Sequence, residues 1–588
     1  MKGAKWLWVV LALACGRIVA DDLAYKERLL GALVQSTPRI LARFDSETGR
    51  FGTGIWICRD QHPMYPLAVV YATAAEGNRY YRDPQLLEVI VKAGDPLLAN
   101  MDAEGRWEFV KKDGSTWGRI WMPWTYSRWI RTFALVRHAM PAEARRRWSE
   151  ALRRGYGAIS RTQLGGVHNI SAHHAMGLYI AGQVFGRDEW CRQAAEFLLR
   201  VANAQREGGY WSEGVGPVVL YNFVYIDALG TYYAVSGDRR VLPALERSAR
   251  FHRHFTYPGG QNVETIDGRN PYDGTIAEGN VGFTFSPEGR AYLFRQWSRL
   301  GWEGLDADLI ASLTLYGQEG PMAAGGADED GVFVLREGGE ARAATIRRRP
   351  WFICLSAYTA PISTSRWIQD RQNLVSIYHD KVGLIVGGGN TKCQPLWSNF
   401  TVGDPSLLSH APGDTSPDFR PRGELYHVPR QATLVLDPEP GLDLVYGEQA
   451  CQIRLRVVDE RKLEYTLRAS VGASLPVAAH LTLIPRMNQP LETAAGRSVL
   501  IRGEPVVLPA DQLGPWIAHG GFRLHLPATF VQTGYRLDLP PGAALRWPVL
   551  PHNPYRKDGR AEPAEGRIAL RLPFDADHDQ SRVVIEVP

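Results

Sequence analysis

Cysteine is scarce in this sequence. Only 6 of the 588 residues are cysteines. Beyond Cys15 they are widely spaced, at positions 58, 191, 354, 393 and 451. No two of them have the spacing of zinc ligands, and the count is far too low for a disulfide-rich scaffold. We therefore expect mostly buried thiols, with at most one or two disulfide bridges.

The sequence also lacks a run of Lys and Arg long enough to indicate a nucleic-acid-binding tail, and after its first residues it lacks an apolar run long enough to span a membrane. Its 67 Lys and Arg residues against 62 Asp and Glu residues give a formal net charge of +5. This basicity is mild for the length and does not indicate a nucleic-acid-binding tail. It suits an acidic ligand, small or polymeric, whereas nucleic acid and a membrane are not expected as partners.

Residues 1–20 have the pattern of a secretory signal peptide. Lys2 and Lys5 precede an apolar run over residues 6–14, and small residues follow up to Ala20. We expect cleavage after Ala20 and a secreted or periplasmic location. Cys15 leaves a lipoprotein anchor as the alternative, although Ala12 stands where a lipoprotein signal usually has Leu.

The length and composition indicate a folded protein with two or more domains. Hydrophobic residues make up 45% of the chain and charged residues 22%, which is typical of globular proteins and argues against disorder. The 18 Trp and 24 Tyr side chains can stack on sugar rings or fill hydrophobic cores. Composition alone leaves both uses open.

From about residue 67 to 316 the sequence predicts a series of helix pairs. The buried stripe of one such helix consists of Trp190, Ala194, Phe197, Leu198 and Val201. Helix pairs in series build either an open solenoid or a closed toroid. Long linkers over residues 107–122, 208–216 and 261–280 favour the toroid, because loops gathered at one end of a ring form a cleft. We expect an incomplete α/α toroid over residues 23–335.

After about residue 341, short strand-like runs bounded by Gly, Pro and Asp replace the helices. They cover residues 374–378, 382–386, 432–436, 453–458, 479–484, 522–526 and 582–587. Such runs, without helical periodicity, are typical of antiparallel sheets stacked as a sandwich. The sequence thus predicts an α+β multidomain protein, with an N-terminal incomplete α/α toroid followed by a C-terminal antiparallel β-sandwich over residues 345–588.

Polar residues crowd the start of one predicted helix. His168, Asn169, His173 and His174 lie within seven residues of one another. Groups that titrate near neutrality, at the mouth of a helical repeat, indicate an active site more than a core. The structural alternative is that Asn169 only caps a helix that begins at Ile170 or Ser171. Because His173 and His174 are adjacent, at most one of them is expected to reach a cleft.

Three local patterns over about residues 120–240 resemble the heparinase II/III and alginate lyase group of polysaccharide lyases. The segment from Trp124 to Arg131 resembles the family helix that carries an Arg, here Arg128, into the cleft. The His168-Asn169 helix resembles the family's Asn/His helix, and the loop with Glu213 resembles its Glu-then-Tyr loop. The catalytic residues that the resemblance implies are Asn169, His168, His173, Arg128 and either Tyr221 or Tyr225.

These residue types suit the β-elimination of a uronate unit. The weakly acidic C5 proton must leave, so donors such as Asn, His or Arg must neutralise the adjacent carboxylate. A base with a pKa near neutrality takes the proton, which suits His or a Tyr beside a cation. A Tyr hydroxyl can protonate the departing glycosidic oxygen. The expected ligand is therefore an acidic polysaccharide or oligosaccharide.

Further residues are candidates for binding the substrate. Trp124, Trp211 and Glu213 come from the family-like patterns, and Arg269 and Tyr272 from a polar segment over residues 264–274. The alternative for that segment is a linker held by Asx turns. His379, in the predicted sandwich, is a candidate for reaching across to the cleft, as sandwich residues do in related lyases. No metal ligands are identified and no cofactor is expected; a structural divalent metal and the oligomeric state stay open.

Two other classes of function remain. A glycoside hydrolase on the same toroid would use paired carboxylates. Its candidates are Glu213, Asp227, Asp267, Asp273 and Glu278. A non-catalytic glycan-binding protein is the third class, and an epimerase would share the abstraction of the C5 proton with a lyase. Only the lyase generates ultraviolet absorbance from a new C4–C5 double bond.

Overall fold

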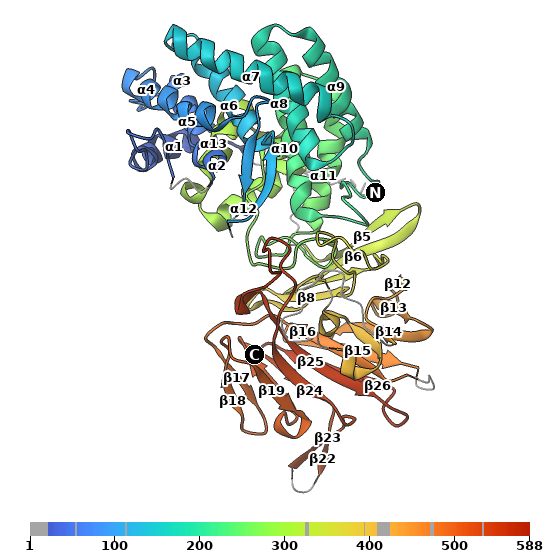
Figure 1. Cartoon of the computed structure of the whole chain (residues 1–588). Coiled ribbons are helices and arrows are strands. Elements are labelled where there is room, and N and C mark those ends of the chain that lie inside the picture. Colours follow the sequence, from blue (N-terminus) through green and yellow to red (C-terminus); the bar gives the residue numbers. More distant parts are fainter. Residues whose placement is uncertain are drawn as a thin grey trace, which may run out of the picture.

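The computed structural model describes residues 22–52, 56–111, 114–323, 329–392, 394–408, 424–470, 475–531 and 534–588. The predicted signal peptide, Cys15 and Cys393 lie outside the described residues. Helices dominate the first part of the chain and strands the second, and the two parts form two lobes (Figure 1). This confirms an α+β protein with helices and large antiparallel sheets.

The helical lobe runs to Tyr316. Its helices are α1 Lys26–Leu41, α2 Ile57–Asp60, α3 Met64–Ala72, α4 Pro84–Ala93, α5 Asp95–Asn100, α6 Pro123–Val136, α7 Ala142–Thr162, α8 Asn169–Phe185, α9 Asp188–Asn203, α10 Val219–Ser236, α11 Leu242–His254, α12 Pro287–Leu300 and α13 Ala307–Tyr316. A hairpin of β2 Trp107–Val110 and β3 Thr116–Ile120 interrupts them, and β1 Asp22–Leu23 pairs with β4 Gly320–Pro321. No helix among the described residues is long and apolar enough to cross a membrane.

Local sequence explains where the helix that carries the polar residues begins and ends. At the N-terminus of α8, the ring of His168 accepts from the Ser171 N–H and the Ser171 hydroxyl lies 3.1 Å from the His168 N–H, which completes a capping box. At the other end Gly186 takes a left-handed conformation with φ of 64°, which glycine adopts without strain. Between these ends α8 packs against α6, α9 and α10.

The sheet lobe contains two large antiparallel sheets. One is 11-stranded, in the order β19-β24-β25-β16-β9-β8-β7-β6-β5 with β10 and β11 attached, and the other is 9-stranded, in the order β12-β13-β14-β15-β26-β21-β20-β17-β18. The first consists of β5 Gly331–Glu337, β6 Glu340–Arg348, β7 Trp351–Ser356, β8 Val375–His379, β9 Gly383–Val386, β10 Phe400–Gly403, β11 Leu425–Tyr426, β16 Val477–Leu483, β19 Val506–Pro509, β24 Ala544–Val549 and β25 Arg567–Phe574. The second consists of β12 Gln431–Val435, β13 Gly441–Tyr446, β14 Gln449–Val457, β15 Lys462–Ala469, β17 Pro490–Thr493, β18 Ser498–Leu500, β20 Trp516–His519, β21 Phe522–His525 and β26 Gln580–Glu586. A separate hairpin joins β22 Ala528–Val531 to β23 Gly534–Leu537.

Strands β7 and β8 contact both lobes, because their side chains point alternately to the two faces of the sheet. Ile353 and Ile377 belong to the core that residues of both large sheets share. Phe352, Cys354 and Tyr378 point to the opposite face, where they pack with helical-lobe residues such as Phe255 and Tyr257. Both strands are therefore buried along their whole length. The 11-stranded sheet faces its partner sheet on one side and the helical lobe on the other.

The first strands of this sheet begin earlier than the sequence predicts. β5 starts at Gly331 and β6 ends at Arg348, so the expected limits at residues 335 and 345 fall inside strands. β5 is the edge strand of the sheet and is partly exposed. Its Arg and Glu side chains are typical of a protected edge strand. In the sequence alone, such a charged segment looks like a linker between domains.

Candidate functional site

Glu213 is the centre of a polar cluster at the N-terminus of α8. It lies in the loop between α9 and α10. Its Oε1 accepts a hydrogen bond from the Asn169 N–H (3.3 Å) and from the Tyr225 hydroxyl (3.2 Å), and its Oε2 lies 3.6 Å from Nη1 of Arg269. The positive end of the α8 dipole also favours a carboxylate at this place. Three groups from separate parts of the sequence thus meet around one carboxylate.

Asn169 and His168 lie at the start of α8, beside Glu213. Asn169 is the first residue of α8, and its Oδ1 accepts from the Ile170 N–H at 2.6 Å. The cap of the helix is His168, whose Nδ1 accepts from the Ser171 N–H, so Nε2 carries the proton of the neutral ring. The partial burial of the His168 ring lowers its pKa, and the charge of Glu213 opposes this shift. His168 itself is exposed and Asn169 is half-buried.

Tyr225 contacts Glu213 and in turn packs on Trp211. The ring of Tyr225 stacks on that of Trp211, with centroids 5.0 Å apart and planes at 13°. Trp211 donates its backbone N–H to Asn222 and its indole N–H to the Val201 carbonyl, and it is buried. Burial and the charge of Glu213 raise the pKa of Tyr225. The predicted contact of Trp211 with substrate is therefore not supported, because neighbouring helices enclose its ring.

Tyr221 lies one turn before Tyr225 on α10 and faces the sheet lobe. Its hydroxyl is 3.1 Å from the hydroxyl of Tyr555, which lies in the loop between β24 and β25. The guanidinium carbon of Arg269 is 4.4 Å from the centroid of the Tyr221 ring and 5.1 Å from that of Trp367. Burial and Tyr555 raise the pKa of Tyr221, whereas the charge of Arg269 opposes that rise. Of the two candidate tyrosines, Tyr221 is the one beside a cation.

The position of Arg269 depends on Asp267. The buried carboxylate of Asp267 accepts from the N–H groups of Val219 (2.7 Å), Arg269 (2.7 Å) and Asn270 (2.8 Å). This Asx turn fixes the loop to the start of α10. The turn expected as the alternative for this segment is thus present, and it holds Arg269 in place. Asp267 has no open side on which it could serve as a hydrolytic carboxylate.

A second polar cluster lies inside the helical lobe and contains other residues of the predicted site. Nε2 of His173 is 2.8 Å from the Ser127 hydroxyl, and its Nδ1 is 3.9 Å from Oδ2 of Asp227. The ring of Trp124 packs edge-on against His173, with centroids 4.5 Å apart. His173 is only 4% exposed, and burial followed by the charge of Arg131 holds its pKa well below the ordinary value. It is a neutral, enclosed imidazole.

Arg128 belongs to the second cluster as well. Its Nε donates to Asp308 on α13 at 2.6 Å and its Nη1 donates to the Trp124 carbonyl at 3.1 Å. Burial raises the pKa of both Asp227 and Asp308, against the charges of Arg128 and Arg131. Arg128 is therefore paired across the helical lobe, and Arg269 is the arginine next to Glu213 and Tyr221.

Tyr272 and His379 do not join either cluster. The ring of Tyr272 packs near Tyr257 at the interface of the lobes, with centroids 6.2 Å apart. His379 is buried beside Trp351 in the sheet lobe, and its Nε2 lies 3.0 Å from the Glu460 carbonyl oxygen. The expected reach of His379 toward the helical lobe is not supported, because its side chain points into the opposite face of β8 from Tyr378.

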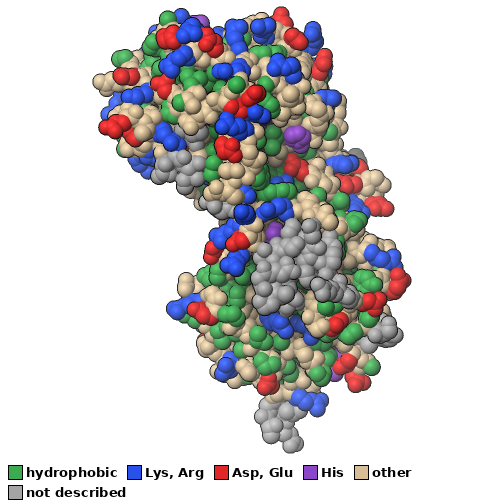
Figure 2. All heavy atoms as spheres, in the orientation of Figure 1, with side chains coloured by type: hydrophobic (Ala, Val, Ile, Leu, Met, Phe, Trp, Pro, Cys, Tyr) green, Lys and Arg blue, Asp and Glu red, His purple; other side chains and the backbone are tan. Residues whose placement is uncertain are grey.

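A cleft of about 1400 Å³ lies between the lobes beside Tyr221 and Arg269. Its helical side includes Trp56, Arg59, Phe109, Lys111, Trp117 and Leu220, and its sheet side includes Gln369, Asn390, Tyr555, Arg556 and Lys557. With Arg269, five cationic side chains line it, against Asp273, Asp558 and Glu565. Figure 2 shows Lys and Arg side chains gathered at the waist between the lobes. Aromatic rings and an excess of cations suit an anionic sugar polymer.

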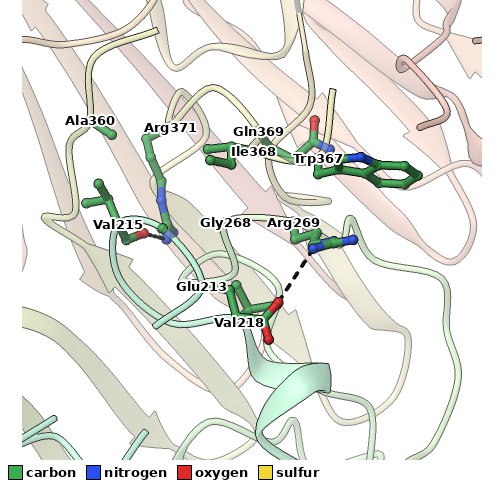
Figure 3. Close-up of a pocket in the computed structure, with 11 residues that line it drawn as sticks. Glu213, Val215, Val218, Gly268, Arg269, Ala360, Trp367, Ile368, Gln369 and Arg371 are labelled. Atoms are coloured by element: carbon green, nitrogen blue, oxygen red, sulfur yellow. Dashed lines mark hydrogen bonds and ion pairs between the residues drawn. The ribbon is translucent and has the colours of Figure 1, made fainter. Parts of the chain in front are cut away.

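Beyond Arg269 the space narrows to a void of about 10 Å³. Glu213, Arg269, Trp367 and Arg371 are among its lining residues, and Figure 3 shows the Arg269 guanidinium between Glu213 and the Trp367 ring. A volume of this size holds about one water molecule. The sequence does not predict Trp367 and Tyr555 as site residues, because no motif in their loops indicates contact with a helix so distant in the sequence.

The described residues contain no group of three or more His, Cys, Asp or Glu side chains that could hold a metal ion. A buried carboxylate at the edge of the cleft instead contacts a lysine. Oδ1 of Asp370 is 3.0 Å from Nζ of Lys392, and its Oδ2 is 3.3 Å from Nε2 of His427. The ammonium group supplies positive charge within the sheet lobe at this point.

No protein-family model and no curated protein matches the sequence. Several solved structures are similar to this chain. A chondroitin AC lyase of Streptomyces coelicolor A3, determined as a Tyr-to-Ala variant, is 13% identical, with a TM-score of 0.50 over 96% of this chain and 80% of that one. The chain has the fold of this lyase. Heparinase III (11% identity, TM-score 0.49, 90% and 76% covered) and a heparan sulfate lyase HepC variant from Pedobacter heparinus (11%, 0.42, 96% and 88%) are also similar. The resemblance to polysaccharide lyases predicted from the sequence is thus confirmed at the level of the fold.

Proposed function

We propose that this protein is an exported polysaccharide lyase that cleaves a uronate-containing acidic polysaccharide by β-elimination. In this proposal the helices form an incomplete α/α toroid and the two sheets a β-sandwich, with the active site between them. The observation that carries it is the position of Tyr221 and Arg269. Arg269 lines the cationic, aromatic cleft and contacts both the Tyr221 ring and Glu213 of the Asn169–Glu213 cluster. Export rests on the pattern of residues 1–20 alone.

The first task of such an enzyme is to neutralise the carboxylate next to C5. Asn169 and His168 supply this, since the Oδ1 and Nδ1 atoms are occupied by backbone N–H groups and the remaining N–H groups are donors. The first turn of α8 adds its dipole. Neutral donors stabilise the developing enediolate without binding the ground-state carboxylate as tightly as an ion pair does.

The second task is proton transfer, which we assign to Tyr221. As a phenolate, Tyr221 accepts the C5 proton, the C–H electrons form the C4–C5 double bond, and the C4–O bond breaks. The same hydroxyl then returns the proton to the departing glycosidic oxygen. Arg269 stabilises the phenolate through its charge, and Tyr555 fixes the hydroxyl at 3.1 Å.

The remaining members of the predicted catalytic set take supporting roles in this proposal. Tyr225 donates to Glu213 and so orients the carboxylate that holds Arg269 and the start of α8. His173 and Arg128 hold the interior of the helical lobe together through Ser127 and Asp308. Neither of them contacts the cluster around Glu213, so we assign them no step in the reaction.

The test is a screen of the purified protein against alginate, heparan sulfate, chondroitin and hyaluronan, with ultraviolet absorbance followed over time. At least one polymer should give unsaturated product. Tyr221→Phe should then lower kcat by about 10²–10³, with a much smaller change in KM. Tyr81→Phe, at a half-exposed tyrosine on the surface of the helical lobe, is the matched control and should leave the rate unchanged.

Other outcomes would redirect the assignment. Reducing sugar released without absorbance would point to a hydrolase, and C5 inversion without absorbance would point to an epimerase. If Tyr225→Phe abolishes turnover while Tyr221→Phe does not, the acid–base role belongs one helical turn further along α10. If Asn169→Ala lowers only the melting temperature, Asn169 serves the helix and not the substrate.

A further inference from the structure

Five side chains connect the two lobes at the inner end of the cleft. We call them the clamp: Trp117, Tyr221, Arg269, Trp367 and Tyr555. Trp117 and Trp367 meet edge to face with ring centroids 5.3 Å apart, and Trp367 and Tyr555 meet with centroids 5.4 Å apart. Tyr221 and Tyr555 are joined at 3.1 Å, and Arg269 lies over both Tyr221 and Trp367. Three of these contacts join the lobes: Trp117 with Trp367, Tyr221 with Tyr555, and Arg269 with Trp367.

The hairpin of β2 and β3 brings Trp117 to the clamp. Trp107, at the start of the hairpin, is fully buried and donates its indole N–H to the Leu97 carbonyl, which anchors the hairpin on the helices. Phe109 stacks on Trp117 with centroids 4.8 Å apart and planes at 16°. Trp117 is nevertheless 50% exposed, since its free face borders the cleft. The hairpin thus holds an aromatic ring across the gap between the lobes.

The space differs greatly on the two sides of the clamp. Trp117, Arg269 and Tyr555 line the cleft of about 1400 Å³, which exceeds the roughly 300–1,000 Å³ of pockets for drug-sized ligands. Arg269 and Trp367 line the void of about 10 Å³ on the other side. Aromatic rings with centroids 5.3 Å apart are in contact, so no sugar ring fits between them. A polymer that lies in the cleft therefore cannot pass between Trp117 and Trp367.

We infer that the enzyme is exolytic: it accepts only a chain end and releases a small unsaturated fragment of constant size. This inference rests on the proposed function. The groups assigned to the reaction, Tyr221 and Arg269, are themselves members of the clamp, so the bond that is cleaved lies where the cleft ends. The rest of the polymer extends outward along the cationic residues, among them Arg59 and Lys111. An internal linkage could reach Tyr221 only if several clamp contacts opened together.

The experiment follows the products and the polymer at the same time. The intact protein is incubated with whichever of the four polymers gives ultraviolet absorbance, and samples are separated by size from the earliest time point. We expect one small unsaturated fragment from the start, while the average mass of the remaining polymer and the viscosity stay nearly unchanged. Fragments of many sizes with a rapid fall in viscosity would overturn the exolytic inference and leave the lyase intact. No absorbance with any polymer would overturn both.

Variants test whether the clamp is the barrier. Trp117→Ala combined with Trp367→Ala should open the inner end and shift the products of the same polymer to longer, mixed lengths. Phe530→Ala, which removes another highly exposed aromatic ring (72%) in a hairpin of the sheet lobe, should leave the product sizes unchanged. Melting curves show whether the double variant is folded. If the double variant is folded and still releases only the small fragment, the clamp does not limit access to the active site. If it does not fold, the product sizes from the unaltered protein decide whether the enzyme is exolytic.

Discussion

Replacement of Arg269 is the sharpest test of the assigned chemistry. The guanidinium carbon lies 4.4 Å from the centroid of the Tyr221 ring. Taking a charge separation of about 5 Å to the phenolate oxygen and an effective dielectric constant of about 20, the attraction is about 3 kcal/mol. Loss of that attraction should slow the reaction on the order of 100-fold, because it acts on a charge that exists only when Tyr221 is deprotonated. Arg269→Gln should therefore lower kcat far more than it raises KM.

The pH dependence gives the same test a second readout. Burial and Tyr555 raise the pKa of Tyr221, so at neutral pH only a small fraction is phenolate, and kcat should climb as the pH rises. Without Arg269 the pKa of Tyr221 should be higher still, so the alkaline rise in kcat should move to higher pH. Arg269→Lys keeps a positive charge and should fall between the two. The planar contact with Trp367 would be lost, so rescue should be incomplete.

The assay is the initial rate of absorbance increase over a range of pH and substrate concentration. Arg146→Gln is the control, since it removes one positive charge from the exposed face of α7, where Arg146 pairs with Glu143 and Glu150. If Arg269→Gln keeps kcat within about threefold of the unaltered enzyme and raises only KM, Arg269 binds substrate uniformly. Arg269 would then not stabilise a phenolate at Tyr221.

Two further predictions concern stability. Burial, followed by the charge of Asp306, raises the pKa of Glu278 to about 7 from an ordinary value of 4.5, so the folded protein holds a proton there that the unfolded chain has already released. The free energy of unfolding should therefore fall by up to about 3 kcal/mol as the pH rises from the ordinary value of 4.5 to about 7. The melting temperature should be lower at about pH 8 than at about pH 5, and Glu278→Gln should remove the share of this difference that Glu278 causes. An unchanged difference would contradict the raised pKa of Glu278. Lys392→Met leaves the buried carboxylate of Asp370 without its ammonium partner at 3.0 Å and should cost about 3–5 kcal/mol in denaturant unfolding, whereas the exposed Lys381→Met should cost less than about 0.5 kcal/mol. Equal losses in the two variants would show that the buried pair contributes nothing.

Periodicity was enough to predict the elements but not the hairpin that reaches the clamp. The run expected over residues 374–378 is β8 Val375–His379, and the one expected over 582–587 is β26 Gln580–Glu586. Each of these strands alternates its side chains between two environments or buries nearly every residue, which leaves a strong signal. The β2–β3 hairpin lies outside the hydrophobic core along most of its length, so its sequence has the mixed character of a linker.

The candidate site was predictable only where its residues share one element. Asn169 and His168 were recognisable because they start one helix, and Tyr221 and Tyr225 because they share a face of another. The separation of Arg128 from Arg269 was not predictable, since it depends on Asp308 of α13 lying opposite Arg128 in the folded chain. Trp367 and Tyr555 come from loops of the other lobe. Contacts of this kind are set by how the two lobes dock, which local sequence does not encode.

The docking of the lobes is itself built into β7 and β8. Because Ile353 and Ile377 face the core of the sheets while Phe352 and Tyr378 face the helices, each strand contributes to two hydrophobic clusters at once. A shift of either strand by one residue would exchange the two sets and disturb both clusters. The same docking sets the distance between Tyr221 and Tyr555, and between Trp117 and Trp367. The geometry that we assign to proton transfer and to recognition of a chain end therefore depends on the register of strands that contact no substrate.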